Sequence, residues 1–458
     1  MRSPDDILAE LDQVADADSP WRSDRYFSYV FNSSDDVVAL GHEAHRRFSG
    51  ANGLDPTVFT SFVKFENDLV AFCRDLVNGD DQVAGSFTSG GTESILLAVK
   101  AARDAKRAEL HDPHAALNIV VSESAHGAFH KAAKYFDVEL RSVPGGEDFR
   151  VDPERLLAEA DADTAMVVTS APQFAHGTCD PIEEIAALTA ARDLWLHVDA
   201  CMGGFTLPFI PDSPRFGFDV EGVTSISMDL HKYGYTTKGA SVALYRTAEL
   251  RRFAFSSSAN WTGYPIVNTA MQSTKSGGPL AAAWAVVTHL GMDGYQRLVD
   301  DARAATLRLA EFIEDHDDLA LTAQPDATLI AMVTTPHARA NVFGLAGSMR
   351  DRGWKMGPTP HFGTSPAHLH LTMTATHLDI MDELLADFDA SLAEGRHPES
   401  LLGDDPDMGD MDPGDFEALL SAVDLSADRE VIDATLDTLD PQWRELALQV
   451  AFDGMFRA

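Results

Sequence analysis

One lysine stands out because of its position in the sequence. The chain has 458 residues but only nine lysines, and two of them, Lys232 and Lys238, fall within SISMDLHKYGYTTK. Lys232 follows His231 at the end of a run that is typical of a β-strand. A lysine amine can form a Schiff base with an aldehyde, which would give this residue a catalytic role. A solvated surface lysine is the ordinary alternative, so other residues must decide whether Lys232 is catalytic.

A second feature is the glycine-rich turn in FTSGGTES at residues 87–94, directly before a strongly helical stretch. Two glycines let the backbone approach a ligand closely. The N–H groups at a helix N-terminus and the helix dipole attract an anion such as phosphate. Gly91 and Thr92 are therefore candidate phosphate contacts, although a Gly-Gly pair before a helix is usually only a turn.

Two further side chains follow predicted strands. Asp199 ends the run LWLHVDA, and a carboxylate at the end of a buried strand needs a partner. It is either a structural aspartate or the group that keeps a pyridinium nitrogen protonated. His126 follows another strand, where it is either structural or stacked on a flat cofactor. Together with the lysine and the glycine turn, these residues indicate pyridoxal 5'-phosphate (PLP), whose ring accepts electrons from the substrate.

Short apolar or β-branched runs alternate with helical stretches through the middle of the chain. This alternation predicts an α/β fold with a mostly parallel central sheet flanked by helices. Ligands bind such sheets beyond the carboxyl ends of the strands. The predicted strands are residues 117–124, 137–143, 164–171, 194–200, 223–229 and 240–246, and the predicted helices include residues 62–77, 92–110 and 181–193.

The length predicts more than one domain. We expect an N-terminal helical segment (1–50), a large PLP-binding domain (51–290), a small C-terminal α+β domain (291–395) and an acidic, partly helical extension (396–458). Residues 401–458 hold fifteen acidic residues and three arginines, yet parts of this region keep the apolar spacing of helices. The extension either docks on the body or on a partner subunit, or it is a solvated tail.

Composition restricts the partners and the location. The formal net charge is −37, so the surface repels nucleic acid and anionic membranes. No apolar run approaches the roughly 20 residues that span a bilayer, and the acidic first residues do not resemble a signal peptide. The three cysteines have no metal-like spacing and fit reduced thiols. We expect a cytoplasmic protein with no metal site.

Five segments resemble sphingosine-1-phosphate lyase and, more loosely, the group II PLP-dependent decarboxylases. They are FTSGGTESILLAVKAARD, SESAHGAFHKAAKYF, SAPQFAHGTCDPIEEIA, HVDACMGGF and SISMDLHKYGYTTKG. The similarity runs from about residue 50 to 300 and continues more weakly to about 390. It implies a fold-type-I PLP enzyme that works as a homodimer with shared active sites on a small amine or amino-acid substrate.

The same resemblance implies roles for residues at matching positions. Lys232 would be the Schiff-base lysine, Asp199 would bind the pyridinium nitrogen, and His126 would stack on the ring. Lys238 would be a second lysine near the substrate. The cofactor phosphate would be contacted by Gly91, Thr92 and His231. Gly277 and Gly278 would form a turn that reaches the partner subunit's cofactor.

The chain departs from the sphingosine-1-phosphate lyase pattern at two places near the substrate. The family stretch Asn-x-Leu-His-Pro reads NGLDP here, so Asn52 is kept but Asp55 stands where the family has histidine. A carboxylate beside a phosphate is repulsive. Lys275, in STKSGG, replaces a family arginine and is a point charge without the arginine's two-pronged hydrogen bonding. Both departures disfavour a phosphorylated substrate.

We therefore expect a PLP-dependent carbon–carbon lyase that acts through an external aldimine, with amino-acid decarboxylation favoured. The bond held perpendicular to the cofactor ring decides the reaction, because its electrons can enter the ring. Cleavage of a phosphorylated sphingoid base to an aldehyde is the alternative. An aminotransferase is a lesser alternative, since no arginine that would grip a carboxylate is identified, and a non-catalytic homologue would not need the three cofactor residues together.

Salt dependence provides the first test of these expectations. A net charge of −37 with scarce lysine either serves solubility alone or adapts the protein to a salty cytoplasm, where salt screens the repulsion between its charges, and the second hypothesis is testable. Activity and helical circular dichroism should fall together as salt is removed. Full activity and helicity without added salt would contradict this prediction.

Overall fold

The computed structural model describes residues 2–403, 406, 411–422 and 429–456. Its largest element is a seven-stranded sheet in the order β1-β7-β6-β5-β4-β2-β3. All neighbours run parallel except β7, which is antiparallel to both β1 and β6. The strands are β1 (Ala84–Thr88), β2 (Asn118–Ser122), β3 (Glu139–Val143), β4 (Thr164–Ser170), β5 (Leu196–Asp199), β6 (Val223–Met228) and β7 (Ser241–Tyr245).

Alternate side chains of the central strands enter two different cores. Val120, Val167 and Val198 pack on one face, whereas Ile119 and Met166 pack on the other, as the two-residue period of a strand requires. Helices from the crossover connections bury both faces, as parallel sheets need. They are α4 (Gly91–Glu109), α5 (Ala128–Phe136), α6 (Pro153–Ala158) and α7 (Ile182–Ala190), with the 3₁₀ turn η1 (Leu207–Phe209) nearby, and the short helix α8 (Ala248–Arg252) follows β7.

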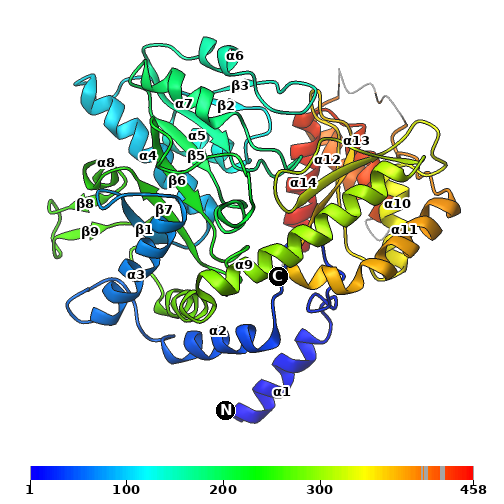
Figure 1. Cartoon of the computed structure of the whole chain (residues 1–458), viewed down its shortest axis with the longest axis horizontal. Helices are drawn as coiled ribbons and strands as arrows, with labels where there is room; N and C mark the ends of the chain where they lie inside the picture. The colour runs from blue at the N-terminus through cyan, green and yellow to red at the C-terminus, as the bar shows by residue number, and fades with distance from the viewer. Residues whose placement is uncertain (1, 404–405, 407–410, 423–428, 457–458) are drawn as a thin grey trace.

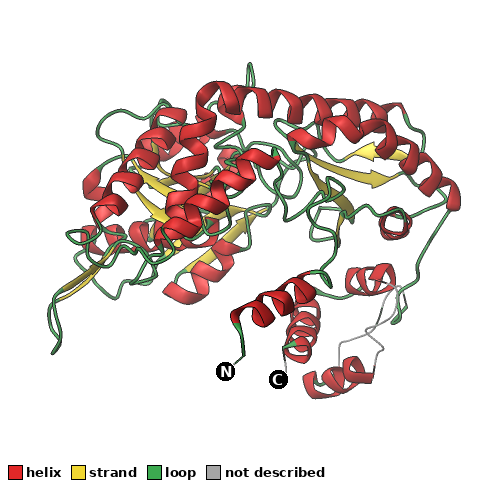
Figure 2. Ribbon diagram, turned by 90° about the horizontal axis from the view of Figure 1, so that it is seen from below, coloured by secondary structure: helices red, strands yellow, loops and turns green. Residues whose placement is uncertain are grey.

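A second, smaller sheet has the order β10-β11-β13-β12 and is antiparallel throughout. The long helix α9 (Gly277–Asp315) lies along both sheets and bends at Gly291, whose φ of 53° favours glycine (Figures 1 and 2). The elements of this smaller unit are β10 (Leu319–Leu321), β11 (Leu329–Thr334), α10 (Val342–Asp351), β12 (Gly357–Thr359), β13 (His368–Thr372), η2 (Ala375–Ile380) and α11 (Met381–Glu394).

Helices near the two ends of the chain pack against this body. At the N-terminal side, α1 (Pro4–Ala15) buries none of its residues, α2 (Asp35–Arg47) packs on α9, and α3 (Thr60–Leu76) packs on α9 and β1. A short hairpin of β8 (Ser256–Ser258) and β9 (Ile266–Asn268) projects from the large sheet's side. No helix within the described ranges is both long and apolar enough to span a membrane.

The acidic extension forms α12 (Pro413–Ala422), α13 (Arg429–Asp437) and α14 (Pro441–Met455), drawn in red beside the small domain in Figure 1. Glu430 of α13 is only 8% exposed and forms ion pairs with Arg350 and Arg396 of the small domain. A buried carboxylate is stable only with such partners. The described part of the extension therefore docks on the body of its own chain.

The sequence-based α/β fold with a mostly parallel central sheet is confirmed, and each of the six predicted strands contains an observed one. Strand β1 was not predicted, because its sequence AGSFT is rich in small residues with weak strand preference. The helical run α9 is interrupted by non-helical backbone at Gly291, next to the boundary predicted at residue 290, and that boundary stays a prediction. The other domain limits stay predictions.

Candidate active site

The glycine turn after β1 makes room at the start of α4. Gly90 has φ 154°, and no side chain caps the N-terminus of the helix, so its first N–H groups have no side-chain partner there. A Cβ at Gly91 would lie 2.7 Å from an Asp229 oxygen and 2.8 Å from the Cys201 sulfur. Only glycine allows the helix start to lie this close to the neighbouring strand ends. The site can thus receive an anion at a helix N-terminus.

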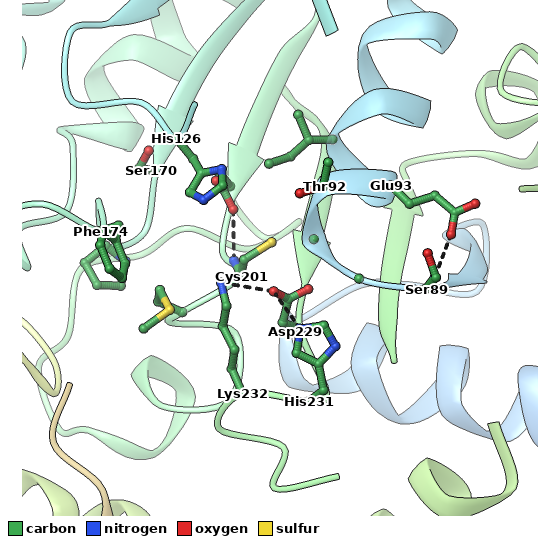
Figure 3. Close-up of a pocket in the computed structure, with 16 residues that line it drawn as sticks. Ser89, Thr92, Glu93, His126, Ser170, Phe174, Cys201, Asp229, His231 and Lys232 are labelled. Carbon is green, nitrogen blue, oxygen red and sulfur yellow. Dashed lines mark hydrogen bonds and ion pairs between the residues drawn. The ribbon is translucent and has the colours of Figure 1, made fainter. Parts of the chain in front are cut away.

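A buried glutamate holds this turn in place. Glu93 Oε2 accepts a hydrogen bond from the Ser89 backbone N–H at 2.5 Å, and Oε1 accepts one from Met271 N–H at 2.6 Å (Figure 3). Glu93 therefore ties the glycine turn to the loop before α9. Sequence reasoning missed this residue. The available signal was an acidic residue in the first turn of a helix, where a carboxylate is favourable.

Lys232 and Asp229 form an ion pair beyond the end of β6. The Lys232 amine lies 3.0 Å from Asp229 Oδ2, while the buried Asp229 Oδ1 has no hydrogen-bond partner in the described structure. Burial alone lowers the pKa of Lys232, but the Asp229 charge outweighs it and holds that pKa above its ordinary value. Asp229 was also missed, although it stands three residues before Lys232 in MDLHK.

Asp199 is held at the end of β5 by polar neighbours. Its Oδ1 accepts hydrogen bonds from Cys201 N–H at 3.0 Å and from the Ser227 hydroxyl at 3.2 Å. The Ser227 hydroxyl lies 3.3 Å from His197 Nε2, and burial lowers the pKa of His197 to about 4, so that ring is neutral. This chain fixes the carboxylate in one orientation, which is what binding a ring nitrogen requires.

Two histidines border the same cavity from different connections. His126 lies in the connection after β2, and its Nδ1 accepts a hydrogen bond from Ala128 N–H at 3.1 Å. His231 lies beside Gly90, and its Nδ1 accepts from Ala240 N–H at 3.1 Å. Backbone donors thus set the orientation of both rings.

The structure brings six of the predicted residues around one cavity of about 350 Å³. Figure 3 shows Lys232 pointing toward Asp229, with His126 and Thr92 on opposite sides. A helix N-terminus for a phosphate, a fixed carboxylate for a ring nitrogen and a lysine amine for an aldehyde are the groups that PLP needs. These residues fit PLP. The six are Lys232, Asp199, His126, Gly91, Thr92 and His231.

Three predicted residues, Asn52, Gly277 and Gly278, lie outside this cavity and near one another. Asn52 pairs with Ser276 across an isolated β-bridge, and Gly277 N–H donates to Ala51 O at 2.8 Å. A Cβ at Gly278 would lie 2.7 Å from the His45 ring, so glycine allows α9 to approach α2. The roles proposed for Asn52, Gly277 and Gly278 are not performed in their own subunit's cavity.

Asp55 and Lys275 are both engaged locally. Asp55 is exposed, and its Oδ1 accepts hydrogen bonds from Thr57 N–H and Oγ1–H, which lower its pKa. The Lys275 amine lies 2.9 Å from both carboxylate oxygens of Glu66 and 3.2 Å from Phe87 O. Because Glu66 neutralises Lys275 inside the fold, the lysine does not replace the family arginine as a substrate contact in this subunit.

Lys238 lies on the other side of His231 from the cofactor cavity. Its amine donates to His231 O at 3.2 Å and lies 5.0 Å from the centre of the Phe31 ring. Surrounding protein and the Lys232 charge lower the pKa of Lys238 to about 8, although the residue keeps contact with solvent. Lys238 therefore carries a proton that it can give up near neutral pH.

Comparison with known proteins agrees with the fold and with the cofactor. The fold and cavity are those of a fold-type-I PLP-dependent enzyme, and PLP is confirmed as the cofactor of the group. Residues 5–334 match the pyridoxal-dependent decarboxylase conserved domain, so the chain belongs to that family. Within it, the chain is sphingosine-1-phosphate lyase-like, as the sequence resemblance indicated.

The similarity to individual sphingosine-1-phosphate lyases can be given in numbers. It is 35% identical over 399 residues to a sphingosine-1-phosphate lyase of Oryza sativa subsp. japonica, covering 84% of this chain and 72% of that protein. Identity to the Mus musculus sphingosine-1-phosphate lyase 1 is 33%, covering 81% of this chain and 65% of the relative. The chain thus spans about two thirds of these relatives.

Solved structures share the fold over most of the chain. A sphingosine-1-phosphate lyase of Burkholderia pseudomallei K96243 is 30% identical, with a TM-score of 0.81, covering 86% of this chain and 91% of that one. A Lactobacillus brevis glutamate decarboxylase is 19% identical, with a TM-score of 0.77, and the match covers 86% of this chain and 93% of that one. The second likeness concerns the fold alone.

We predict that Lys232→Ala abolishes the visible absorbance of covalently bound PLP, because no other lysine lines the described cavity. Turnover should fall by at least about a thousandfold, the usual scale for losing an essential catalytic group. Lys134→Ala, which removes an exposed lysine on α5, is the control and should change neither quantity. Wild-type turnover in Lys232→Ala would contradict the assignment.

Proposed function

We propose that this protein is a PLP-dependent aldehyde-lyase that cleaves the bond between the amine-bearing and hydroxyl-bearing carbons of a long-chain amino alcohol. Its family membership makes it a decarboxylase-family lyase, and the finer reaction is the proposal. The relatives with sphingosine-1-phosphate lyase names support this choice over decarboxylation. The cleavage divides the substrate into a long-chain aldehyde and a short amine.

An apolar groove beside the cofactor cavity carries the proposal. It has a volume of about 600 Å³ and shares His231 with the cavity as a common wall. An amine bound at Lys232 could therefore extend an apolar chain past His231 into the groove, where its burial is favourable. The groove's aromatic side chains are Trp21, Tyr26, Tyr29, Phe31 and Tyr235.

The proposed roles follow from the positions of the residues. Bound PLP supplies a ring that accepts the electrons of the broken bond. Lys232 would hold the cofactor aldehyde through its amine, and Asp229, whose Oδ2 lies 3.0 Å from that amine, would hold the proton of the amine. Asp199 keeps the ring nitrogen charged, and His126 covers the ring and excludes water. Lys238, whose pKa of about 8 leaves a fraction of its amine neutral near neutral pH, lines the groove, where the neutral form would take up the hydroxyl proton.

Amino-acid decarboxylation is the second candidate. A probable L-tyrosine/L-aspartate decarboxylase of Methanocella arvoryzae is 31% identical over 384 residues, covering 84% of this chain and 96% of that protein. The earlier support from Asp55 is weaker, since its carboxylate is occupied by Thr57. Aminotransferase activity is disfavoured further, because no arginine lines the described part of the cavity.

Product analysis distinguishes the two candidates. Protein loaded with PLP in high salt is incubated with dihydrosphingosine 1-phosphate, with dihydrosphingosine, and with a panel of L-amino acids including tyrosine and aspartate. We expect hexadecanal from a long-chain amine and no CO₂ from the panel, with Lys232→Ala as the inactive control. Comparing the two long-chain amines shows whether the phosphate is recognised. Release of CO₂ without any aldehyde would overturn the proposal.

We also propose that two copies form a homodimer with shared active sites. The predicted residues Asn52, Gly277 and Gly278 gather away from their own cavity, as residues that serve a partner's site would, and Asp55 is an exposed residue three positions after Asn52. Helix α1 supports a partner surface, because it exposes an apolar face to solvent. The residues of this face are Ile7, Leu8, Leu11 and Val14.

Mixing inactive variants tests the shared site. Asp55→Trp should block the partner's cavity, and unfolding and refolding it together with Lys232→Ala should restore about a quarter of wild-type activity. In a mixed dimer, one site combines an intact lysine with an intact Asp55. Asp112→Trp is the control, because Asp112 caps a similar exposed turn elsewhere. Absence of recovery from the mixture would show that the sites are not shared.

A further inference from the structure

The C-terminal extension holds one residue of the small domain by its backbone. Asp437 Oδ1 accepts a hydrogen bond from His361 N–H at 2.6 Å and lies 3.0 Å from His361 Nδ1. Arg444 donates to His361 O at 3.0 Å. Three further carbonyls fix the Arg444 guanidinium at 2.8–3.3 Å, namely those of Leu436, Asp437 and Leu439. The extension is therefore hydrogen-bonded to the backbone of His361, the first residue of the turn formed by residues 361–365.

The other side of this turn contacts the large domain near His126. Phe362 and Ser365 close the turn by exchanging two backbone hydrogen bonds of 2.9 and 2.8 Å. Gly363, at φ 54°, lies so close to Glu123 that a Cβ there would collide with the Glu123 carboxylate. Glu123 belongs to the connection between β2 and α5, three residues before His126. The turn thus rests on the connection that carries the cavity histidine.

A second contact joins the turn to the connection after β4. The Ser365 hydroxyl lies 3.0 Å from His176 Nε2, and the other ring nitrogen lies 3.1 Å from Thr322 Oγ1. The His176 ring also stacks on Phe149 with ring centres 3.6 Å apart. Burial lowers the pKa of His176 to about 3, so the ring is neutral, with one nitrogen donating and the other accepting.

Phe174, two residues before His176, borders the cofactor cavity. Its ring centre lies 3.9 Å from that of His370 on β13, and its side chain is 43% exposed in the cavity wall (Figure 3). His126 and Phe174 thus both lie on connections rather than on strands. Loop residues hold their positions only through tertiary contacts, since no ladder of strand hydrogen bonds fixes them.

We propose that Asp437 and Arg444 are positioning residues for the cofactor cavity. Their hydrogen bonds to His361 hold the 361–365 turn in contact with Glu123 and His176. The turn then fixes the positions of His126 and Phe174 beside bound PLP. The acidic extension is therefore a support for the cofactor site, more than 300 residues away in sequence from His126. It acts through contacts within one chain and does not depend on which substrate is cleaved.

Cofactor release from the PLP-loaded full chain tests this proposal. Asp437→Ala removes both hydrogen bonds to His361, and the release rate should rise about tenfold, the scale expected for losing a charged hydrogen bond. The circular dichroism of bound PLP should weaken, because it reports how rigidly the protein surrounds the ring. Asp437→Asn keeps an oxygen acceptor for His361 N–H and should restore most of both signals.

Asp415→Ala is the matched control, because it removes the same charge from an exposed position on α12 of the same extension. Its release rate and dichroism should equal those of the wild type. Melting curves are recorded for every variant. A general loss of stability would also change the PLP release rate and the dichroism of Asp415→Ala and Asp437→Asn. Unchanged release and dichroism in Asp437→Ala would overturn the proposal.

A double variant identifies the route of the effect. His176→Ala cuts the turn's contact from the large-domain side without touching the extension, and it should also speed release. If both residues act through the turn, the double variant should release PLP within about twofold of the faster single variant. Multiplication of the two single effects, or a wild-type rate in His176→Ala, would show that the extension does not act through this contact.

Discussion

The ion pair between Lys232 and Asp229 is the interaction around which the site is arranged. A lysine amine in a protein interior needs a counter-charge, and Asp229, three residues earlier, supplies it beyond the end of β6. The pairing of β5 with β6 places Asp199 opposite Ser227, which holds the Asp199 carboxylate. The sheet register therefore fixes the spacing between the lysine and the aspartate. The glycine turn can lie this close to Asp229 and Cys201 only because Gly91 has no Cβ.

The parallel sheet fixes the ends of its strands, but it provides no ladder of hydrogen bonds for the connections that follow them. Glu93 ties down the glycine turn from within the large domain. The connections that carry His126 and Phe174 instead meet the turn at residues 361–365 of the small domain. The small domain and the extension thus complete a cavity whose chemical groups all come from the large domain.

Residue types and periodicity were enough to predict the α/β fold and the cofactor. Six strands were found because apolar and β-branched runs mark them, whereas β1 was missed because AGSFT carries little of that signal. Lys232, Asp199 and His126 were identified because each follows a strand, and strand ends meet at one edge of a parallel sheet. Asp229 and Glu93 were missed because an acidic residue alone does not show whether it is buried.

The sequence by itself determined the local elements, the cofactor chemistry and the family, since these depend on short motifs and on the spacing of apolar residues. Only the tertiary structure decided which charged groups are free to act. Asp55 accepts hydrogen bonds from Thr57, two residues further on, and Lys275 is neutralised by Glu66, which is 209 residues away in the sequence. The Lys275–Glu66 pair joins distant parts of the chain, so no local pattern contains it. The same reason hid the contact of Asp437 with His361.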